Sequence, residues 1–264
     1  MSGRRTALIT GASSGFGVEF AKLFARDGFD LVLVARSEPP MQELAEQLRG
    51  AHAIEATVIA KDLSTDGASD ELVADLAARG IQVDALVNNA GFAQYGPFVD
   101  ADPGDLHQMV AVNVVALTAL TRSLLPGMVE RGWGRIVNLG SIGSFTAAPM
   151  TGAYAATKAY VLSLSLALTE EVAGTGVTVT ALCPGPTETG FQARAEMADS
   201  QLIAGRTLDS AEAVARAGYA AMKKGRPYLI TGTTSKVFAF GSRFLPRTMS
   251  AKIAGRSQQR IAGS

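Results

Sequence analysis

The chain has 264 residues with 24 basic and 24 acidic side chains, so its formal net charge is zero. Hydrophobic residues make up 47% and charged residues 18% of the sequence, which excludes a disordered chain. The balanced charge argues against nucleic acid as a partner, because proteins that bind duplexes usually carry a basic excess. A chain of this length is expected to form a single α/β domain that buries about three-quarters of its unfolded surface.

Cysteine and histidine are scarce. Cys183 is the sole cysteine, which excludes an intrachain disulfide and a cysteine-based metal site. The two histidines, His52 and His107, leave little for a zinc site or a Ser-His-Asp triad, so no metal is expected. The sequence has no run of about twenty apolar residues, and its first apolar run is too short for a secretory signal, so we expect no transmembrane segment and a cytoplasmic setting.

Apolar runs of strand length alternate with longer segments of helical period along the chain. The expected strands are 6–10, 30–35, 57–60, 85–88, 134–139, 177–182 and 227–231. The expected helices between them are 16–27, 40–48, 68–78, 103–129, 153–172 and 210–222.

The expected strands are continuous apolar runs, such as LVLVA and VTVTAL, without polar alternation. Strands of this kind are buried on both faces of a parallel sheet. The sequence therefore predicts a Rossmann-like, doubly wound parallel sheet of about seven strands with helices on both faces. Two segments break the alternation, and we expect a substrate lid at 187–208 and a basic helical tail at 233–264, all within the single domain 1–264.

A glycine-rich turn joins the first strand to the first helix, in the sequence TGASSGFG at 10–17. Glycines at such a turn allow the backbone to approach a pyrophosphate, whose charge lies at the helix N-terminus. No lysine follows the last glycine, which argues against ATP or GTP hydrolysis. The expected cofactor contacts here are Gly11, Ser13, Ser14, Gly15, Phe16 and Gly17.

The end of the second strand indicates which dinucleotide binds. An acidic residue usually stands there and binds the adenosine ribose, but this chain has Ala35-Arg36-Ser37. A guanidinium and a hydroxyl can bind a 2′-phosphate that a carboxylate would repel. Arg36 and Ser37 therefore favour NADP(H) over NAD(H).

The ordered set of motifs resembles the classical short-chain dehydrogenase/reductase family over about residues 5–231. The motifs are TGASSGFG at 10–17, Asp62-Leu63, Asn88-Asn89-Ala90-Gly91, Asn113, Ser141, YxxxK at 154–158 and Pro184-Gly185. The resemblance implies that the catalytic residues are Asn113, Ser141, Tyr154 and Lys158. It also implies that Asn113 holds a water that links Lys158 to solvent, and that Asn88 pins neighbouring strands.

The resemblance implies further cofactor contacts after the third, fourth and sixth strands. Asp62 would accept a hydrogen bond from the adenine amino group, and the Thr187 backbone would meet the nicotinamide carboxamide. Some NADP-using members place a basic residue inside the glycine-rich turn, where this chain has Ser14, so Arg36 alone carries the preference. The implied contacts are Asp62, Leu63, Asn89, Ala90, Gly91, Tyr154, Lys158, Pro184, Gly185, Thr187 and Thr189.

Tyr154 and Lys158 are four residues apart, so a helix presents both on one face. A phenol titrates near pH 10 and needs a neighbouring cation to act as an acid or base at neutral pH. Lowering its pKa by about three units takes roughly 4 kcal/mol, for which Lys158 and an oxidised nicotinamide are the expected sources. Ser141 lies just past a strand end and can hold the reacting oxygen while Tyr154 transfers the proton.

The residues expected near the substrate are mostly apolar, which favours a small ketone or secondary alcohol over a carboxylate. They are Phe92, Gln94, Ile142, Phe145 and Phe191, together with Ser141 and Tyr154. We therefore expect an NADP(H)-dependent oxidoreductase. Two alternatives are a reductase of 3-oxoacyl thioesters on an acyl carrier protein and a non-catalytic, NADPH-sensing binding protein.

The end of the chain is strongly basic, because no acidic residue follows Glu212 whereas ten basic residues do. In the tail, Val237, Phe240 and Phe244 have helical spacing, and Pro246 is expected in the first turn of a second helix. Such a tail can dock on its own domain, bind an anionic membrane peripherally, or bind an acidic carrier protein. The long apolar helices 103–129 and 153–172 predict a homodimer or homotetramer.

Overall fold

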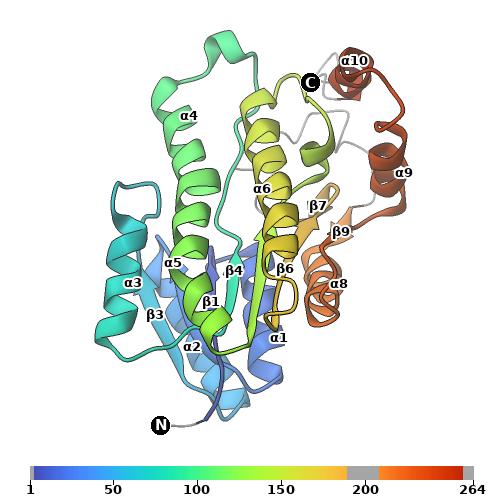
Figure 1. Cartoon of the computed structure of the whole chain (residues 1–264). Helices are drawn as coiled ribbons and strands as arrows, with labels where there is room; N and C mark the ends of the chain where they lie inside the picture. Colours follow the sequence, from blue (N-terminus) through green and yellow to red (C-terminus); the bar gives the residue numbers. More distant parts are fainter. Residues whose placement is uncertain (1–2, 189–207, 258–264) are drawn as a thin grey trace.

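The computed structural model describes residues 3–188 and 208–257 and contains a parallel sheet of seven strands (Figure 1). The order across the sheet is β3-β2-β1-β4-β5-β6-β9, and every neighbouring pair is parallel. The strands are β1 Thr6–Thr10, β2 Asp30–Ala35, β3 Ala56–Ala60, β4 Ala85–Asn88, β5 Gly134–Leu139, β6 Val177–Cys183 and β9 Tyr228–Ile230. The strand order reverses between β1 and β4, and this topology confirms the doubly wound fold.

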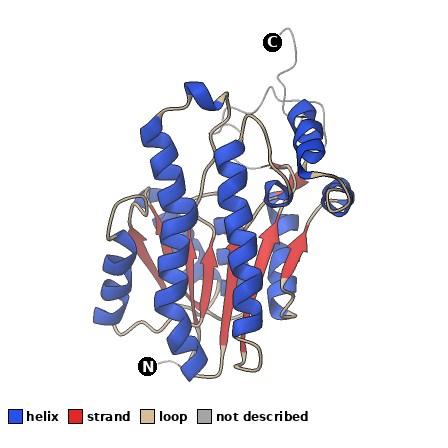
Figure 2. Cartoon of the chain, turned by 45° about the horizontal axis from the view of Figure 1, so that its top comes forward, coloured by secondary structure: helices blue, strands red, loops and turns tan. Residues whose placement is uncertain are grey.

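Helices cover both faces of the sheet (Figures 1 and 2). On one face, α1 Gly15–Arg26, α2 Glu38–Ala51 and α8 Ala211–Lys223 contribute to a buried apolar cluster with the strands. On the other face, a second cluster includes side chains from α3 Ala68–Ala78, α5 Leu117–Glu130 and the end of α6 Gly152–Glu171. Because both faces are covered, the central strands need apolar residues at successive positions, as in the fully buried Ala7, Leu8 and Ile9.

The long helix that was expected at 103–129 has a wider turn in its middle. It consists of α4 Pro103–Val110, a π-helical turn at Ala111–Ala116 and α5. By length and composition alone, Pro103–Glu130 is apolar enough to cross a membrane, which is weak evidence for a span. In the fold, Leu120 and Met128 of this helix are buried in the second apolar cluster, so the helix covers one face of the sheet.

The chain after β6 differs most from expectation. The two-residue strands β7 Thr187–Glu188 and β8 Asp209–Ser210 pair in parallel and join the ends of the expected lid, most of which lies outside the described residues. The tail forms two helices, α9 Thr233–Gly241 and α10 Arg247–Ser257. Pro246 immediately precedes α10, one position before the first helical turn in which it was expected.

Candidate active site

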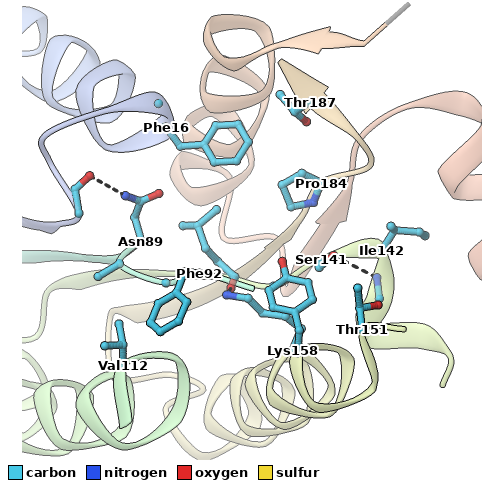
Figure 3. A pocket seen from close by; sticks show the side chains of 18 of the residues that line it. Phe16, Asn89, Phe92, Val112, Ser141, Ile142, Thr151, Lys158, Pro184 and Thr187 are labelled. Carbon is cyan, nitrogen blue, oxygen red and sulfur yellow. Dashed lines mark hydrogen bonds between the residues drawn. The ribbon is translucent and has the colours of Figure 1, made fainter. Parts of the chain in front are cut away.

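A cavity of about 730 Å³ lies along the carboxyl ends of the strands. The segments that follow β1 to β6 all contribute to its lining. In Figure 3, Phe16, Asn89 and Phe92 approach the cavity from one side, and Ser141 and Thr151 approach it from the other. The cavity thus occupies the switch point of the sheet, where open α/β folds bind their ligands.

The glycine-rich turn is held against the loop after β4. Gly11 has a φ of +66°, and a Cβ there would lie 2.7 Å from Asn89 Nδ2. This close approach allows the Asn89 amide to donate hydrogen bonds to the carbonyls of Thr10 and Gly11, at 2.9 and 3.1 Å. A Cβ on Gly17 would clash with the Gly11 carbonyl, so this glycine allows α1 to pack against the turn.

The N-terminus of α1 opens on the cavity. Ser13, Ser14, Gly15 and Phe16 line it. Ser14 is the N-cap residue, but its side chain makes no cap hydrogen bond, and the first turn of α1 carries no acidic residue. The first N–H groups of the helix therefore remain available to an anion, and this cradle fits the pyrophosphate of a dinucleotide.

The far end of the cavity is formed after β2 and β3, where Arg36, Ser37, Asp62 and Leu63 contribute to the lining. Arg36 and Ser37 are exposed. The Asp62 carboxylate accepts hydrogen bonds from the Ser64 N–H at 2.9 Å and from its hydroxyl at 2.7 Å. Burial tends to raise the pKa of Asp62, but these hydrogen bonds and the Arg36 charge outweigh it and hold the pKa below its usual value. This end therefore combines an ionised acceptor with a cation.

Ser141, Tyr154 and Lys158 meet in the middle of the cavity. Ser141 precedes a short 3-10 turn, Ile142–Phe145, where its hydroxyl accepts the Gly143 N–H at 3.1 Å and is hydrogen-bonded to the Tyr154 phenol. Both Tyr154 and Lys158 come from α6, and Lys158 Nζ lies 5.7 Å from the centroid of the Tyr154 ring. Lys158 Nζ also donates a hydrogen bond to the Leu139 carbonyl at 2.7 Å, which fixes its direction.

Burial sets the protonation of this group. Desolvation raises the pKa of Tyr154 to about 12, although the hydrogen bond with Ser141 acts in the opposite direction. Desolvation also lowers the pKa of Lys158 to about 8. The direction for Tyr154 is opposite to the expected depression, because the loss of solvent around the phenol outweighs stabilisation of a phenolate. The site consequently presents a protonated phenol at neutral pH.

Asn113 lies in the π-helical turn and is buried. Its amide donates to the Phe92 carbonyl at 3.0 Å and to the Thr157 hydroxyl at 3.1 Å, and its Oδ1 accepts the Phe92 N–H at 3.2 Å. A Cβ on Gly91 would lie 2.8 Å from Asn113 Oδ1 and 3.5 Å from Lys158 Nζ. Asn113 thus ties the loop after β4 to α6 beside Lys158, although it does not itself line the cavity.

Asn88 and Cys183 lie near the site, and their contacts indicate structural roles. Asn88 donates to Asn138 Oδ1 at 2.8 Å and to the Thr121 hydroxyl at 2.9 Å, which links β4 to β5 and α5. Cys183 is fully buried, and burial raises the pKa of its thiol to about 12. The thiol is therefore protonated at neutral pH, and Cys183 packs as a small residue of the core.

The tail forms a wall of the cavity, which the sequence did not indicate. Thr234, Ser235 and Phe238 of α9 and Ile253 and Ala254 of α10 contribute to the lining. A Cβ on Gly185 would clash with Ser235 Oγ, so the glycine of the Pro184-Gly185 motif lets α9 approach. Val112 and Thr151 are further lining residues that pattern alone did not single out.

Most of the expected contacts reach the cavity, and a few do not. The expected residues in the lining are Gly11, Ser13, Ser14, Gly15, Phe16, Arg36, Ser37, Asp62, Leu63, Asn89, Ala90, Gly91, Phe92, Ser141, Ile142, Tyr154, Lys158, Pro184, Gly185 and Thr187. Gln94 instead donates to Asp105 Oδ2 at 3.0 Å, and Phe145 packs toward Tyr228 with ring centroids 6.4 Å apart, so neither lines it. Gly17 does not line it either, because it packs against the backbone of Gly11. Thr189 and Phe191 lie outside the described residues. Within residues 3–188 and 208–257, no group of three or more His, Cys, Asp or Glu is arranged to hold a metal ion.

Solved structures similar to this chain cover nearly all of it. A short-chain dehydrogenase from Sphingobium yanoikuyae in complex with NADPH is 30% identical with a TM-score of 0.80, covering 98% of this chain and 100% of its own. A bulky-bulky ketone specific alcohol dehydrogenase from Comamonas testosteroni is 31% identical with a TM-score of 0.76, covering 90% of this chain and 92% of its own.

A sequence relative matches a shorter part of the chain. A short chain dehydrogenase from Pseudocercospora fijiensis is 38% identical over 187 residues, which are 70% of this chain and 60% of the relative. The chain thus spans less than two-thirds of that relative's length. The family described as short chain dehydrogenase matches residues 5–199, a span that includes the glycine-rich turn, Ser141, Tyr154 and Lys158. The chain belongs to the short-chain dehydrogenase family of oxidoreductases, which bind a nicotinamide cofactor.

Proposed function

We propose that this protein reduces apolar ketones, and oxidises the corresponding secondary alcohols, with NADP(H) as cofactor. The observation that carries the proposal is the joint placement of Ser141, Tyr154 and Lys158 in the cavity that also contains the glycine-rich cradle. A bound dihydronicotinamide would supply the hydride.

The side chains have separate roles in this reaction. The Ser141 hydroxyl orients the carbonyl oxygen of the substrate and keeps the Tyr154 phenol pointing toward it. Tyr154 donates its proton to that oxygen as negative charge develops there, which suits a phenol that is protonated at neutral pH. Lys158 holds positive charge beside the phenol and stabilises the phenolate that remains. Asn113 positions Lys158 through the loop after β4, and it would hold the water that links Lys158 to solvent.

The preference for NADP(H) depends on Arg36 and Ser37. Both line the far end of the cavity, directly after β2, and no carboxylate stands at Ala35 to repel a 2′-phosphate. The NADPH bound to the Sphingobium yanoikuyae protein supports this assignment. Asp62 and the Leu63 backbone would contact the adenine, and Thr187 and Thr189 the nicotinamide.

The substrate preference follows from the apolar side chains around the reacting centre. Phe92, Val112, Ile142, Phe238 and Ile253 line the cavity there. A pocket of this kind stabilises an apolar group and leaves a carboxylate unpaired. The bulky-ketone specificity of the Comamonas testosteroni dehydrogenase supports a ketone substrate.

The test is turnover of NADPH and NADH with a panel of ketones that differ in size and charge. We expect oxidation of NADPH with apolar ketones and little with oxo acids. Binding of NADPH without turnover of any panel member, or of an acyl-carrier thioester, would instead support a sensor. Turnover of 3-oxoacyl groups on a carrier protein, but not of the free thioester, would support the acyl-carrier alternative.

We also propose that the protein forms a homodimer or homotetramer through the outer face formed by the helix 103–130, which includes α4 and α5, and by α6. The apolar side chains Val110, Val115, Tyr160 and Leu166 are exposed there. Covering this face with its copy in a second subunit removes that surface from water. Light scattering at micromolar concentration should give at least twice the monomer mass, and Val115→Asp should reduce it. A monomer mass for the wild type would contradict the proposal.

A further inference from the structure

The two helices at the end of the chain have an inner face that is fixed to the protein. We call residues 233–257, which include α9 and α10, the C-terminal arm. Ser235 and Ala239 of α9 and Ser250 and Ala254 of α10 are buried. A Cβ on Gly255 would lie 3.1 Å from Pro149 Cγ, which shows how closely α10 approaches the body. The arm is thus docked by its small residues.

The outer face of the arm carries large apolar side chains instead. Val237, Phe240 and Phe244 are 68%, 62% and 73% exposed. Val237 and Phe240 are three residues apart on α9 and share one face, and Phe244 follows in the turn after the helix, so that the three form one stripe. The Phe240 and Phe244 rings contact each other edge to face, with centroids 5.1 Å apart. Met249 is also largely exposed on α10. Nothing in the docking of the arm requires these side chains to be apolar.

The C-terminal arm carries basic residues but no acidic ones. No acidic residue occurs after Glu212 in the sequence. The cations of the arm are Lys236, Arg243, Arg247, Lys252 and Arg256. No ion pair between described residues includes any of these five. Arg243 donates a hydrogen bond to the Tyr228 hydroxyl at 3.2 Å, so it is held near the first residue of β9.

We propose that the outer face of the C-terminal arm is a docking surface for an anionic lipid membrane. Phe240 and Phe244 would enter the boundary between head groups and acyl chains, while the surrounding cations would neutralise lipid phosphates and carboxylates. A second copy of this chain fits the face less well, because two-fold pairing would bring cations against cations. An acidic carrier protein would use the cations and would leave the phenylalanine stripe exposed.

The arm also lies apart from the face proposed for subunit contacts. In Figure 1, α9 and α10 lie on the far side of α6 from α4 and α5. A protein paired through α5 and α6 therefore keeps its arm accessible. Membrane docking and oligomer formation can be tested separately.

The experiment is flotation of the full chain with vesicles. Vesicles of phosphatidylcholine with about 30% phosphatidylserine are compared with pure phosphatidylcholine, at roughly 50 mM and 500 mM salt. We expect the protein to float with the anionic vesicles at low salt, and less of it to float at high salt. Recovery at the bottom with both vesicle types at low salt overturns the proposal, and so does equal flotation with both.

Matched variants identify the face. Phe240→Ser/Phe244→Ser should lower the partition coefficient at least about tenfold, because the apolar contact is lost. Lys252→Gln/Arg256→Gln should lower it roughly thirtyfold at low salt. The control is Phe98→Ser/Val99→Ser, which removes a pair that is 72% and 89% exposed in an acidic stretch of the chain, and flotation should not change. Equal loss in the control overturns the assignment to this face.

Two further measurements test whether the outer face of the arm is instead a subunit contact or a part of the active site. The arm variants should keep the oligomer mass of the wild type in light scattering and should keep turnover of a water-soluble ketone. A fall in mass would show that the face is a subunit contact and would overturn the proposal. Because flotation does not depend on turnover, failure of the proposed reaction leaves this test intact.

Discussion

The two ends of the cavity hold their functional side chains in different ways. At the end around Tyr154, Lys158 is buried, Ser141 and Tyr154 are half-buried, and short hydrogen bonds direct the side chains, such as that from Lys158 to the Leu139 carbonyl at 2.7 Å. At the other end, Arg36 and Ser37 are exposed, and in the proposed function they would act through charge and hydrogen-bonding capacity alone. Burial shifts the pKa values of Tyr154 and Lys158 at the first end, whereas solvent weakens the interactions of exposed side chains at the second. Changes at the catalytic end should therefore cost far more than changes at the cofactor-selecting end.

The largest effect is expected for Tyr154→Phe, which removes only the hydroxyl that we propose as the proton donor. Turnover should fall by about 100- to 10,000-fold, while NADPH binding should be nearly normal. Cofactor fluorescence and steady-state kinetics measure the two quantities. Tyr160→Phe is the matched control on the same helix, and it should keep turnover within about twofold. Retention of more than about a tenth of kcat in Tyr154→Phe would contradict the role of the phenol.

A smaller and selective effect is expected at the other end of the cavity. Arg36→Ala would remove the charge-assisted hydrogen bond proposed for the 2′-phosphate, so NADPH affinity should fall roughly 10- to 150-fold and NADH affinity should hardly change. Lys61 is a useful control, because it lines the same end but is paired with Glu71 at 2.7 Å. Lys61→Ala should affect the two cofactors equally. Equal weakening of both cofactors by Arg36→Ala would show that Arg36 is structural.

The smallest effect concerns the pH dependence at the catalytic end. The pKa of Lys158 is lowered to about 8, so its positive charge is lost as the pH rises through that value, whereas Tyr154 keeps its proton until about pH 12. Ketone reduction at saturating NADPH should be level below about pH 7 and should decline by at most about tenfold per unit above pH 8. Lys158→Arg should move this decline to higher pH. A level profile up to about pH 10 would show that the charge of Lys158 is not needed.

The sheet could be predicted closely because buried parallel strands carry a continuous apolar signal. β1, β2, β4 and β5 have the expected bounds, β3 and β6 are longer by one residue at one end, and β9 is shorter by one residue at each end. The cofactor cradle was equally clear, because close backbone approach at Gly11 and Gly17 requires glycine and leaves a recognisable spacing. Both features are visible in the residue types themselves, as apolar runs in the strands and as glycine where the turn packs against Asn89.

What could not be predicted depends on contacts between distant segments. Gln94 faces Asp105 and Phe145 faces Tyr228, although their positions next to cavity residues suggested otherwise. The pKa of Tyr154 depends on how completely the surrounding protein excludes water, which the spacing to Lys158 does not reveal. The contribution of α9 and α10 to the cavity could not be predicted either, because the basic composition of the tail does not indicate where it packs.

The position of this wall in the chain has a consequence for biosynthesis. A ribosome delivers β1 to β6 together with Ser141, Tyr154 and Lys158 before it reaches β9, α9 and α10. At about 5 to 20 residues per second, the chain beyond Cys183 takes roughly 4 to 16 s to emerge. The cradle for the cofactor can thus form on the nascent chain while the wall that encloses the substrate is still missing. The cofactor side of the cavity would thus be synthesised first, and the wall formed by α9 and α10 last.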